Sequence, residues 1–185
     1  MQILIAMGIT AVVLLGVAKI WQKFGSVAIL PIYINVQAIL YAIALAGGII
    51  VASSIMYRLW ADYRKSADMY LALVVKPLVW ADIIWLGLLP GMSEELLFRG
   101  VMLPAFGFNL AALIVSSLLF GVLHLSSASQ WSYVVWATVI GFALGYVALI
   151  TGNLFIPILA HIITNLVSSS VWKFQHPQKE VTADE

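Results

Sequence analysis

The hydrophobic pattern of the chain consists of long apolar runs separated by short polar connections. The runs cover residues 3–18, 27–57, 69–104, 109–127, 131–150 and 153–172. They are continuously apolar and lack the alternation of outward and inward residues that marks the strands of a membrane β-barrel. Helices satisfy their own backbone hydrogen bonds inside a bilayer. The pattern therefore predicts an all-α fold, a polytopic transmembrane helical bundle of about six spans.

Composition places this bundle in a lipid bilayer. Of the 185 residues, 63% are hydrophobic and 9% are charged, with a mean hydropathy of +1.06, whereas soluble domains carry roughly 25% charged residues. A net charge of +1 and the lack of a basic face interleaved with aromatics give no reason to expect a nucleic-acid partner. The absence of Cys excludes disulfides, thiolate metal ligands and a cysteine nucleophile. The first apolar run has no basic residue before its core and no convincing cleavage site after it, so we expect a retained span.

Basic residues predict the orientation of the bundle. Within 27–57 the span proper is expected near 36–57, because a run of that length exceeds one span. Arg58, Arg64 and Lys65 then form the most basic connection in the chain. The positive-inside rule puts this connection on the cytoplasmic side, or on the stromal side of an organelle. With six spans, both termini are expected on that same side.

The run 69–104 allows two interpretations. In the first, 69–90 crosses the membrane and a second helix begins at Ser93. In the second, 78–104 is a single long span with a kink at Pro90. The second is preferred because it returns the polar tail to the side of the basic connection.

A cluster of charges lies within this apolar run, at Ser93-Glu94-Glu95-Leu96-Leu97-Phe98-Arg99-Gly100. A charged side chain in mid-membrane costs about 2.5–3.5 kcal/mol on insertion scales. The charges of such a cluster are therefore expected to pair with one another, to face the bundle interior or to have a catalytic or binding function. Glu95 and Arg99 are four residues apart and share a helix face, whereas Glu94 is rotated by about 100° from Glu95. Glu94 is therefore the free carboxylate. In the alternative interpretation, the two glutamates only complement the dipole of a helix that starts after Pro90.

Further polar groups are expected at a similar depth. Counting about 1.5 Å per residue, Glu94, His124, His161 and Asn165 lie roughly 12–22 Å from the far side of the membrane. His161 and Asn165 share a helix face, and two donors a turn apart could hold a developing oxyanion. A single membrane histidine is more often an interhelical hydrogen-bond partner, but the convergence of these groups favours an active site.

Other chemistries find little support. The chain contains no His-Glu-x-x-His and no Gly-x-Ser-x-Gly motif, although Glu94, His124 and His161 could in principle ligate a metal from separate helices. What remains is a carboxylate and an imidazole that activate water against a carbonyl, which is the chemistry of peptide hydrolysis within the bilayer.

Three motifs, Glu94-Glu95-x-x-x-Arg99, Phe120-x-x-x-His124 and His161-x-x-x-Asn165, resemble in order and separation those of the CPBP family. That family groups CAAX prenyl endopeptidases with bacteriocin-processing and self-immunity membrane proteins, formerly called Abi. The resemblance covers about 78–172. It implies a glutamate-type intramembrane protease whose cavity opens toward the cytosol. We expect no cofactor, and the older description of this family as metalloproteases leaves a metal as the minority alternative.

The resemblance also implies a role for each motif residue. Glu94 and His124 would activate the water, and Glu95 with Arg99 would shape the site. His161 with Asn165 would stabilise the oxyanion. Phe120 would pack beside the site.

The predicted organisation has three parts: N-terminal transmembrane helices with the basic cytoplasmic loop (1–68), a CPBP-like catalytic core (69–172) and a polar tail (173–185). The sequence around Ser93-Glu94-Glu95-Leu96-Leu97-Phe98-Arg99-Gly100 is similar to that of cyanobacterial and plastid members of the family, and this resemblance implies a plasma membrane or a thylakoid membrane. The GxxxG of Gly141 and Gly145 favours close packing within the bundle and leaves a homo- or hetero-oligomer open.

Two functions from different classes follow. The first is an endopeptidase that cleaves a membrane protein or a lipidated peptide of the prenylated CAAX type. The second is a non-proteolytic assembly, stabilising or immunity factor that binds a membrane partner. A weaker third interpretation, a small channel or transporter, requires a polar path to both faces of the membrane, against which the apolar wall at 110–115 argues.

Overall fold

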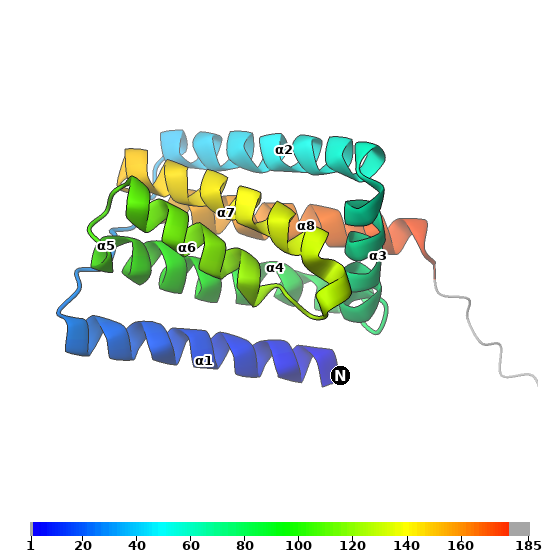
Figure 1. Cartoon of the computed structure of the whole chain (residues 1–185), viewed down its shortest axis with the longest axis horizontal. Coiled ribbons are helices and arrows are strands. Elements are labelled where there is room, and N and C mark those ends of the chain that lie inside the picture. The colour runs from blue at the N-terminus through cyan, green and yellow to red at the C-terminus, as the bar shows by residue number, and fades with distance from the viewer. Residues whose placement is uncertain (1, 178–185) are drawn as a thin grey trace, which may run out of the picture.

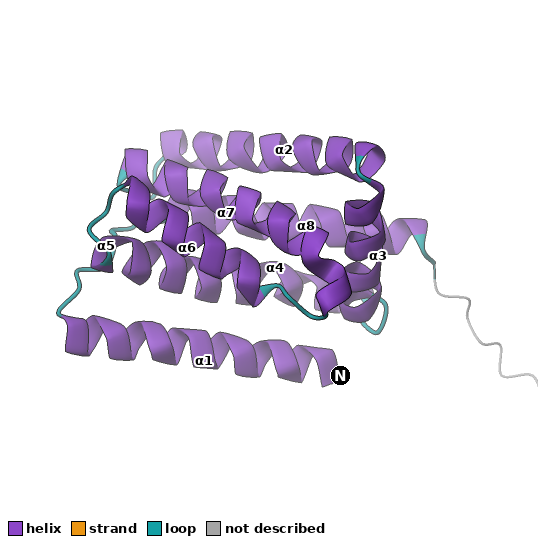
Figure 2. Cartoon of the chain, viewed as in Figure 1, coloured by secondary structure: helices purple, strands orange, loops and turns teal. Residues whose placement is uncertain are grey.

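The computed structural model describes residues 2–177, which form helices and contain no strand (Figure 2). The predicted all-α fold is therefore confirmed. In chain order the elements are α1 (Gln2–Gly25), α2 (Val36–Leu59), α3 (Ala61–Val75), the short 3₁₀ helix η1 (Trp80–Asp82), α4 (Ile83–Glu95), the π-helix η2 (Leu96–Met102), α5 (Leu103–Ala105), α6 (Leu110–Leu123), the 3₁₀ turn η3 (Ala128–Gln130), α7 (Trp131–Thr151) and α8 (Phe155–Gln175). The predicted polar tail starts inside α8, and its residues 178–185 lie outside the described part.

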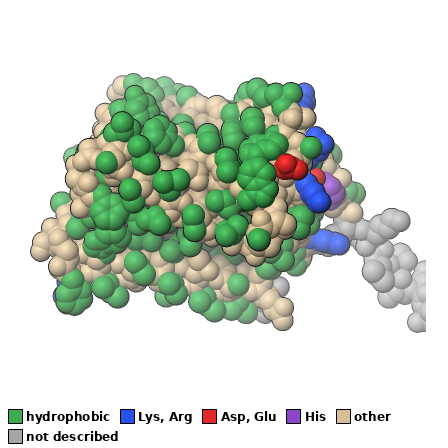
Figure 3. Space-filling view, in the orientation of Figure 1, with side chains coloured by type: hydrophobic (Ala, Val, Ile, Leu, Met, Phe, Trp, Pro, Cys, Tyr) green, Lys and Arg blue, Asp and Glu red, His purple; other side chains and the backbone are tan. Residues whose placement is uncertain are grey.

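The helices α1, α2, α4, α6, α7 and α8 run side by side along the long axis of the molecule, and α3 crosses one end of them (Figure 1). The segment expected as a basic connection is thus largely helical. The start of α1 and the end of α8 lie at the α3 end, where Lys and Arg side chains also gather (Figure 3). The described ends of the chain thus lie at the same end of the bundle as these basic residues. Which side of the membrane this is remains a prediction.

The predicted number of six spans exceeds the number of helices that are long and apolar enough to cross a bilayer. Four described helices, α1, α2, α7 with its lead-in and α8, are long and apolar enough to cross a bilayer, or five if α3 and the helical run Trp80–Ala105 count as one broken span. Helix α6 has 14 residues, about 21 Å at 1.5 Å per residue, whereas a bilayer core is about 30 Å thick. The run Trp80–Ala105 does not count as a span by itself, because the charge cluster at Glu94, Glu95 and Arg99 lies within it. The chain is a multi-pass membrane protein whose charged and short helices lie among the long apolar ones.

Of the two interpretations of 69–104, the structure has the unbroken helical run of the second. The elements η1, α4, η2 and α5 follow one another without a break, and this run is bent from α3 by 106°. Pro104 has no N–H to donate to Gly100 O four residues earlier. The N–H of Leu30, in the connection before α2, donates to that oxygen at 3.0 Å. The N-terminal connection thereby completes the backbone bonding of the helix that carries the charge cluster.

The GxxxG of α7 packs inside the bundle. Gly141 and Gly145 are both buried, and a Cβ atom on Gly141 would lie 2.9 Å from Phe120 Cδ1 of α6. A Cβ on Gly145 would lie 2.6 Å from Leu113 Cδ1 of the same helix. Only glycine allows this approach of α7 to α6. The expected intramolecular role of the motif is therefore confirmed.

Candidate active site

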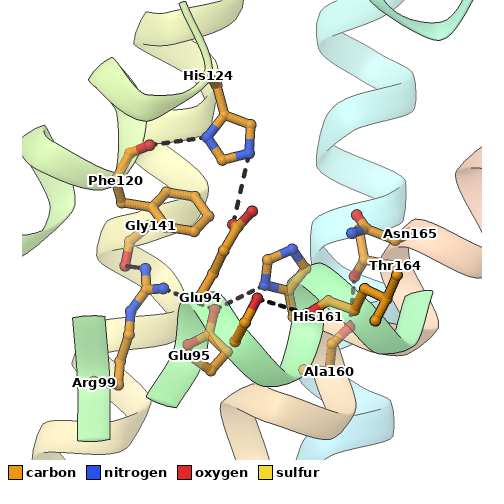
Figure 4. A network of polar contacts seen from close by, with 12 residues as sticks. Glu94, Glu95, Arg99, Phe120, His124, Gly141, Ala160, His161, Thr164 and Asn165 are labelled. Atoms are coloured by element: carbon orange, nitrogen blue, oxygen red, sulfur yellow. Dashed lines mark hydrogen bonds and ion pairs between the residues drawn. The ribbon is translucent and has the colours of Figure 1, made fainter. Parts of the chain in front are cut away.

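The charge pair predicted from the helical spacing is present and fully buried. Arg99 Nη1 donates to Glu95 Oε1 at 2.7 Å, and Arg99 Nη2 donates to the carbonyl oxygen of Gly141 at 2.7 Å (Figure 4). Glu95 Oε1 also accepts from His161 Nδ1 at 2.8 Å. Glu95 is 0% exposed and Arg99 is 1% exposed. This set of bonds joins α4, η2, α7 and α8, and we call it the Glu95 network.

Two further features fix Arg99. Its guanidinium lies 4.4 Å from the ring centroid of Phe120, within the range of a cation–π contact. Arg99 also belongs to the π-helical segment η2, in which the Leu103 N–H donates to Phe98 O five residues earlier. Ser116 Oγ of α6 donates to the same carbonyl oxygen at 3.0 Å. Such π segments often occur at functional sites, and the apolar sequence gives no signal for this one.

Glu94 differs sharply from its neighbour. It is 8% exposed, and its Oε2 atom is buried without a hydrogen-bond partner among the described residues. The nearest basic atom is His124 Nε2 at 3.8 Å, which is longer than a hydrogen bond. Glu94 and His124 therefore face each other without a direct bond, and we call them the Glu94–His124 pair.

The tautomer of His124 follows from its other nitrogen. His124 Nδ1 lies 2.8 Å from Phe120 O, and a carbonyl can only accept, so Nδ1 carries the hydrogen. In neutral His124, Nε2 then presents a lone pair toward the Glu94 carboxylate. Two acceptors that face each other across 3.8 Å call for a donor between them, and a water molecule has the two O–H groups required.

The Glu94–His124 pair lies on a cavity of about 500 Å³. His161 and Asn165 of α8 also line this cavity, together with Phe120, whereas Glu95 and Arg99 do not. All the remaining cavity walls come from α1, α2, α3, α4, α6, α7, α8 and the turn after α6, and most of these side chains are apolar. The cavity thus offers an apolar chamber with one free carboxylate and two imidazoles.

Asn165 has a structural bond as well as a place on the cavity. Pro90 lacks the N–H that would bond to Leu86 O four residues earlier, and Asn165 Nδ2 donates to that oxygen at 3.4 Å. One amide hydrogen of Asn165 remains for a ligand. His161 uses Nδ1 for Glu95, so its Nε2 could donate only from the imidazolium form. The oxyanion role expected for His161 and Asn165 remains a prediction. It requires the second amide hydrogen of Asn165 and the imidazolium form of His161.

Five of the six predicted residues therefore form the two groups: Glu95, Arg99 and His161 in the Glu95 network, and Glu94 with His124 in the Glu94–His124 pair. The sixth, Asn165, belongs to neither group but lines the same cavity. Tyr70 of α3 and Tyr133 of α7 also line the cavity, and the sequence analysis missed both. Nothing in their spacing distinguishes them from other interfacial aromatics. Among residues 2–177, no group of three or more His, Cys, Asp or Glu side chains is placed to hold a metal ion.

Part of the chain matches a known protein family. Residues 76–167 match the family described as type II CAAX prenyl endopeptidase Rce1-like. In this segment, about half of its length, the chain belongs to the Rce1-like family. The predicted resemblance to the CPBP proteins, which include this family, is confirmed. All six candidate residues lie within the Rce1-like segment.

One curated relative extends the comparison. The chain is 39% identical over 98 residues to YpbD of Bacillus subtilis (strain 168), described as an uncharacterized protein. The aligned region is 53% of this chain and 49% of YpbD, so the match spans about half the length of that relative. No solved structure matches the chain.

Proposed function

We propose that this Rce1-like protein is an intramembrane endopeptidase in which Glu94 and His124 activate a water molecule. The observation that carries the proposal is the buried, unpartnered Oε2 of Glu94 that faces His124 Nε2 at 3.8 Å on the cavity. A buried carboxylate normally has hydrogen-bond partners. One left open toward a second acceptor is suited to bind and deprotonate water.

In the proposed reaction, the Glu94 carboxylate accepts a proton from the water held between it and His124. The resulting hydroxide attacks the carbonyl carbon of the scissile peptide bond, and the carbonyl oxygen becomes an oxyanion. The free amide hydrogen of Asn165 and the imidazolium of His161 are the donors for this charge. The proton on Glu94 then passes to the departing amine nitrogen as the C–N bond breaks.

The Glu95 network supports this division of labour. Glu95 Oε1 accepts from both Arg99 and His161, so the charge of this carboxylate is matched, although its Oε2 has no hydrogen-bond partner among the described residues. A carboxylate in this state fixes its neighbours but is a poor base. It also fixes the His161 ring, whose Nδ1 it binds.

The proposed substrate is a membrane protein or lipidated peptide, of which the prenylated CAAX type fits the family and the apolar cavity walls. The decisive experiment measures cleavage of a quenched prenyl-peptide and of a library of membrane peptides by the purified full chain in nanodiscs. Wild type is compared with Glu94→Gln, each with and without a chelator. Asp62→Asn is the matched control, because it removes an exposed carboxylate of α3 outside the cavity.

The proposal expects cleavage by wild type and Asp62→Asn, loss in Glu94→Gln, and no effect of the chelator. A chelator-sensitive activity would replace the glutamate mechanism by a metal-dependent one. If no substrate is cut and Glu94→Gln still supports the cellular role, the protein binds a membrane partner without proteolysis.

The proposed orientation has its own test. We propose that the α3 end, with the cavity beneath α3, faces the cytoplasm in a plasma membrane or thylakoid membrane. Because the natural chain contains no Cys, single cysteines can be labelled with an impermeant maleimide. Ser129→Cys lies in the exposed turn beside α3, and Ala28→Cys lies exposed between α1 and α2. Labelling of Ala28→Cys from outside, with Ser129→Cys protected until the membrane is opened, is the expected result, and the reverse would invert the topology.

A further inference from the structure

His124 lies among aromatic rings from three helices. The ring centroid of Phe120 is 4.8 Å from that of His124, and those of Tyr133 and Tyr70 are 6.2 and 6.4 Å from it. The two tyrosine rings stack on each other with centroids 4.6 Å apart and planes 24° apart. The imidazole thus has Phe120 and a tyrosine pair as neighbours.

This enclosure matters because the backbone constrains His124 weakly. His124 is the C-cap residue of α6, and residues 125–129 that follow it are exposed. Its ring makes one hydrogen bond within the described part of the chain, to the carbonyl of Phe120 one turn earlier. A single bond at a helix end leaves the ring plane free to turn, so the ring contacts must fix where Nε2 points.

The neighbouring rings are themselves held firmly. Phe120 is 2% exposed and packs edge-on against Phe98 at 5.5 Å. On the other side, α3 is fastened to α7 by a hydrogen bond of 2.8 Å between the hydroxyls of Ser66 and Ser132, both buried. Tyr63 of α3 also stacks on Tyr133 with planes 10° apart. The Tyr70 ring is therefore fixed through the docking of α3 onto α7.

We infer that Tyr70 and Tyr133 are positioning residues whose stacked rings hold the His124 imidazole with Nε2 toward Glu94. Tyr70 lies on α3, before the matched family segment 76–167, so α3 completes a site that the family segment supplies only in part. The inference concerns the rings and not the hydroxyl groups. It rests on the proposed function only for its turnover measurement.

The test compares leucine and phenylalanine at the two positions in the full chain in nanodiscs. Loss of a ring lets the imidazole turn, and small misplacements of a catalytic group cost up to about 100-fold in rate. Tyr133→Leu and Tyr70→Leu are therefore expected to lower kcat by about 10- to 100-fold with little change in KM. Tyr133→Phe and Tyr70→Phe restore the ring and are expected to recover most of the rate. Tyr146→Leu is the matched control, because Tyr146 is also on α7 but 49% exposed and outside the cavity.

A second measurement is independent of turnover. In protein with ¹⁵N-labelled histidine, the nitrogen shifts report the tautomer of His124, whose signal is assigned by its absence in His124→Ala. The leucine variants are expected to mix the tautomers of His124, whereas the phenylalanine variants and Tyr146→Leu are expected to match wild type.

The two measurements separate the two proposals. If wild type cleaves nothing but the leucine variants alter the His124 signal, the positioning inference stands and the protease proposal falls. If the phenylalanine variants lose as much rate as the leucine variants, the hydroxyls act instead and the inference is overturned. An unchanged His124 signal and an unchanged rate in both leucine variants overturn it as well.

Discussion

Glu94 and Glu95 are adjacent in the chain, yet they occupy opposite kinds of environment. Glu95 is 0% exposed and its Oε1 accepts from Arg99 and His161 at 2.7 and 2.8 Å. Glu94 lines the cavity and faces His124 at 3.8 Å. The Oε2 atom of each glutamate is buried without a hydrogen-bond partner among the described residues, so the difference lies in the bonds of Glu95 Oε1 and in the place of Glu94 on the cavity. The two side chains differ by one helical step of about 100°.

The two glutamates show how a membrane protein can hold a reactive carboxylate next to a structural one. A paired carboxylate stabilises the arrangement of helices but has little capacity left for a ligand, whereas an unpaired one costs stability and is available for chemistry. Here the Glu95 network binds α4, η2, α7 and α8 together, and the Glu94–His124 pair lies on the cavity beside it. Substitutions in the Glu94–His124 pair should therefore mainly lower activity, whereas substitutions in the Glu95 network should mainly lower stability.

The largest effect is expected on the Glu94 side. Glu94→Ala and His124→Ala should each lower the cleavage rate by about 10²- to 10⁴-fold, because each removes a group that activates the water. The folded protein should still accumulate, since neither side chain belongs to the Glu95 network. Rates are measured on purified protein in nanodiscs, and accumulation is measured by immunoblot of membranes.

The double variant sharpens this prediction. If Glu94 and His124 act as a unit, removing both costs little more than removing one. Rate losses that multiply would show that the two residues act in separate steps. Failure of both single variants to accumulate would make the pair structural.

The next largest effect is expected on the Glu95 side. Glu95→Ala should lower the free energy of unfolding by about 3–5 kcal/mol, because it leaves Arg99 buried without its charge partner. The quantity is measured by SDS titration in detergent micelles. Replacing both partners by apolar residues, as in Glu95→Leu with Arg99→Met, should recover most of this loss. A Glu95→Ala variant as stable as wild type would remove the distinction between the two glutamates.

A smaller loss of stability is expected where α7 approaches the network. Gly141→Ala places a Cβ 2.9 Å from Phe120 Cδ1 and 3.3 Å from Arg99 Nη2, and such overpacking costs about 1–3 kcal/mol. Gly47→Ala is the control, because a Cβ on Gly47 of α2 has no atom within 4 Å. Both are followed by the same titration. Equal free energies of unfolding for the two variants would show that α7 shifts to accommodate the added methyl group.

The smallest effect is expected at the π segment. Ser116→Ala removes the hydroxyl that donates to Phe98 O at 3.0 Å, a contribution of about 0.5–1.5 kcal/mol. The carbonyl keeps its bond to Leu103 N, so no buried acceptor is left unpaired. Ser54→Ala removes an exposed hydroxyl that donates to Ile50 O within α2, and it should lower the free energy of unfolding less. A loss above 3 kcal/mol in Ser116→Ala would mean that this hydroxyl maintains the π segment itself.

The sequence by itself determined much of this protein. Its continuous apolar runs required helices, because only helices satisfy the backbone of such segments in lipid. The spacing of Glu95 and Arg99 required their pairing on one helix face, and the one-residue offset of Glu94 separated it from that pair. Three motifs in register were enough to indicate the family, which the comparison of residues 76–167 supports.

Other features were decided only by the tertiary structure. The number of spans depends on the lengths of α6 and of the bent segment, and apolar runs do not reveal where a helix ends. The partners of Gly100 O, Leu86 O and His161 Nδ1 lie 70, 79 and 66 positions away in the chain, too far for any local rule to connect them. The approach of Tyr70 to His124 likewise depends on how α3 packs across the end of the bundle. Local periodicity fixes which face of a helix a residue occupies, but only the packing of helices on one another decides what that face meets.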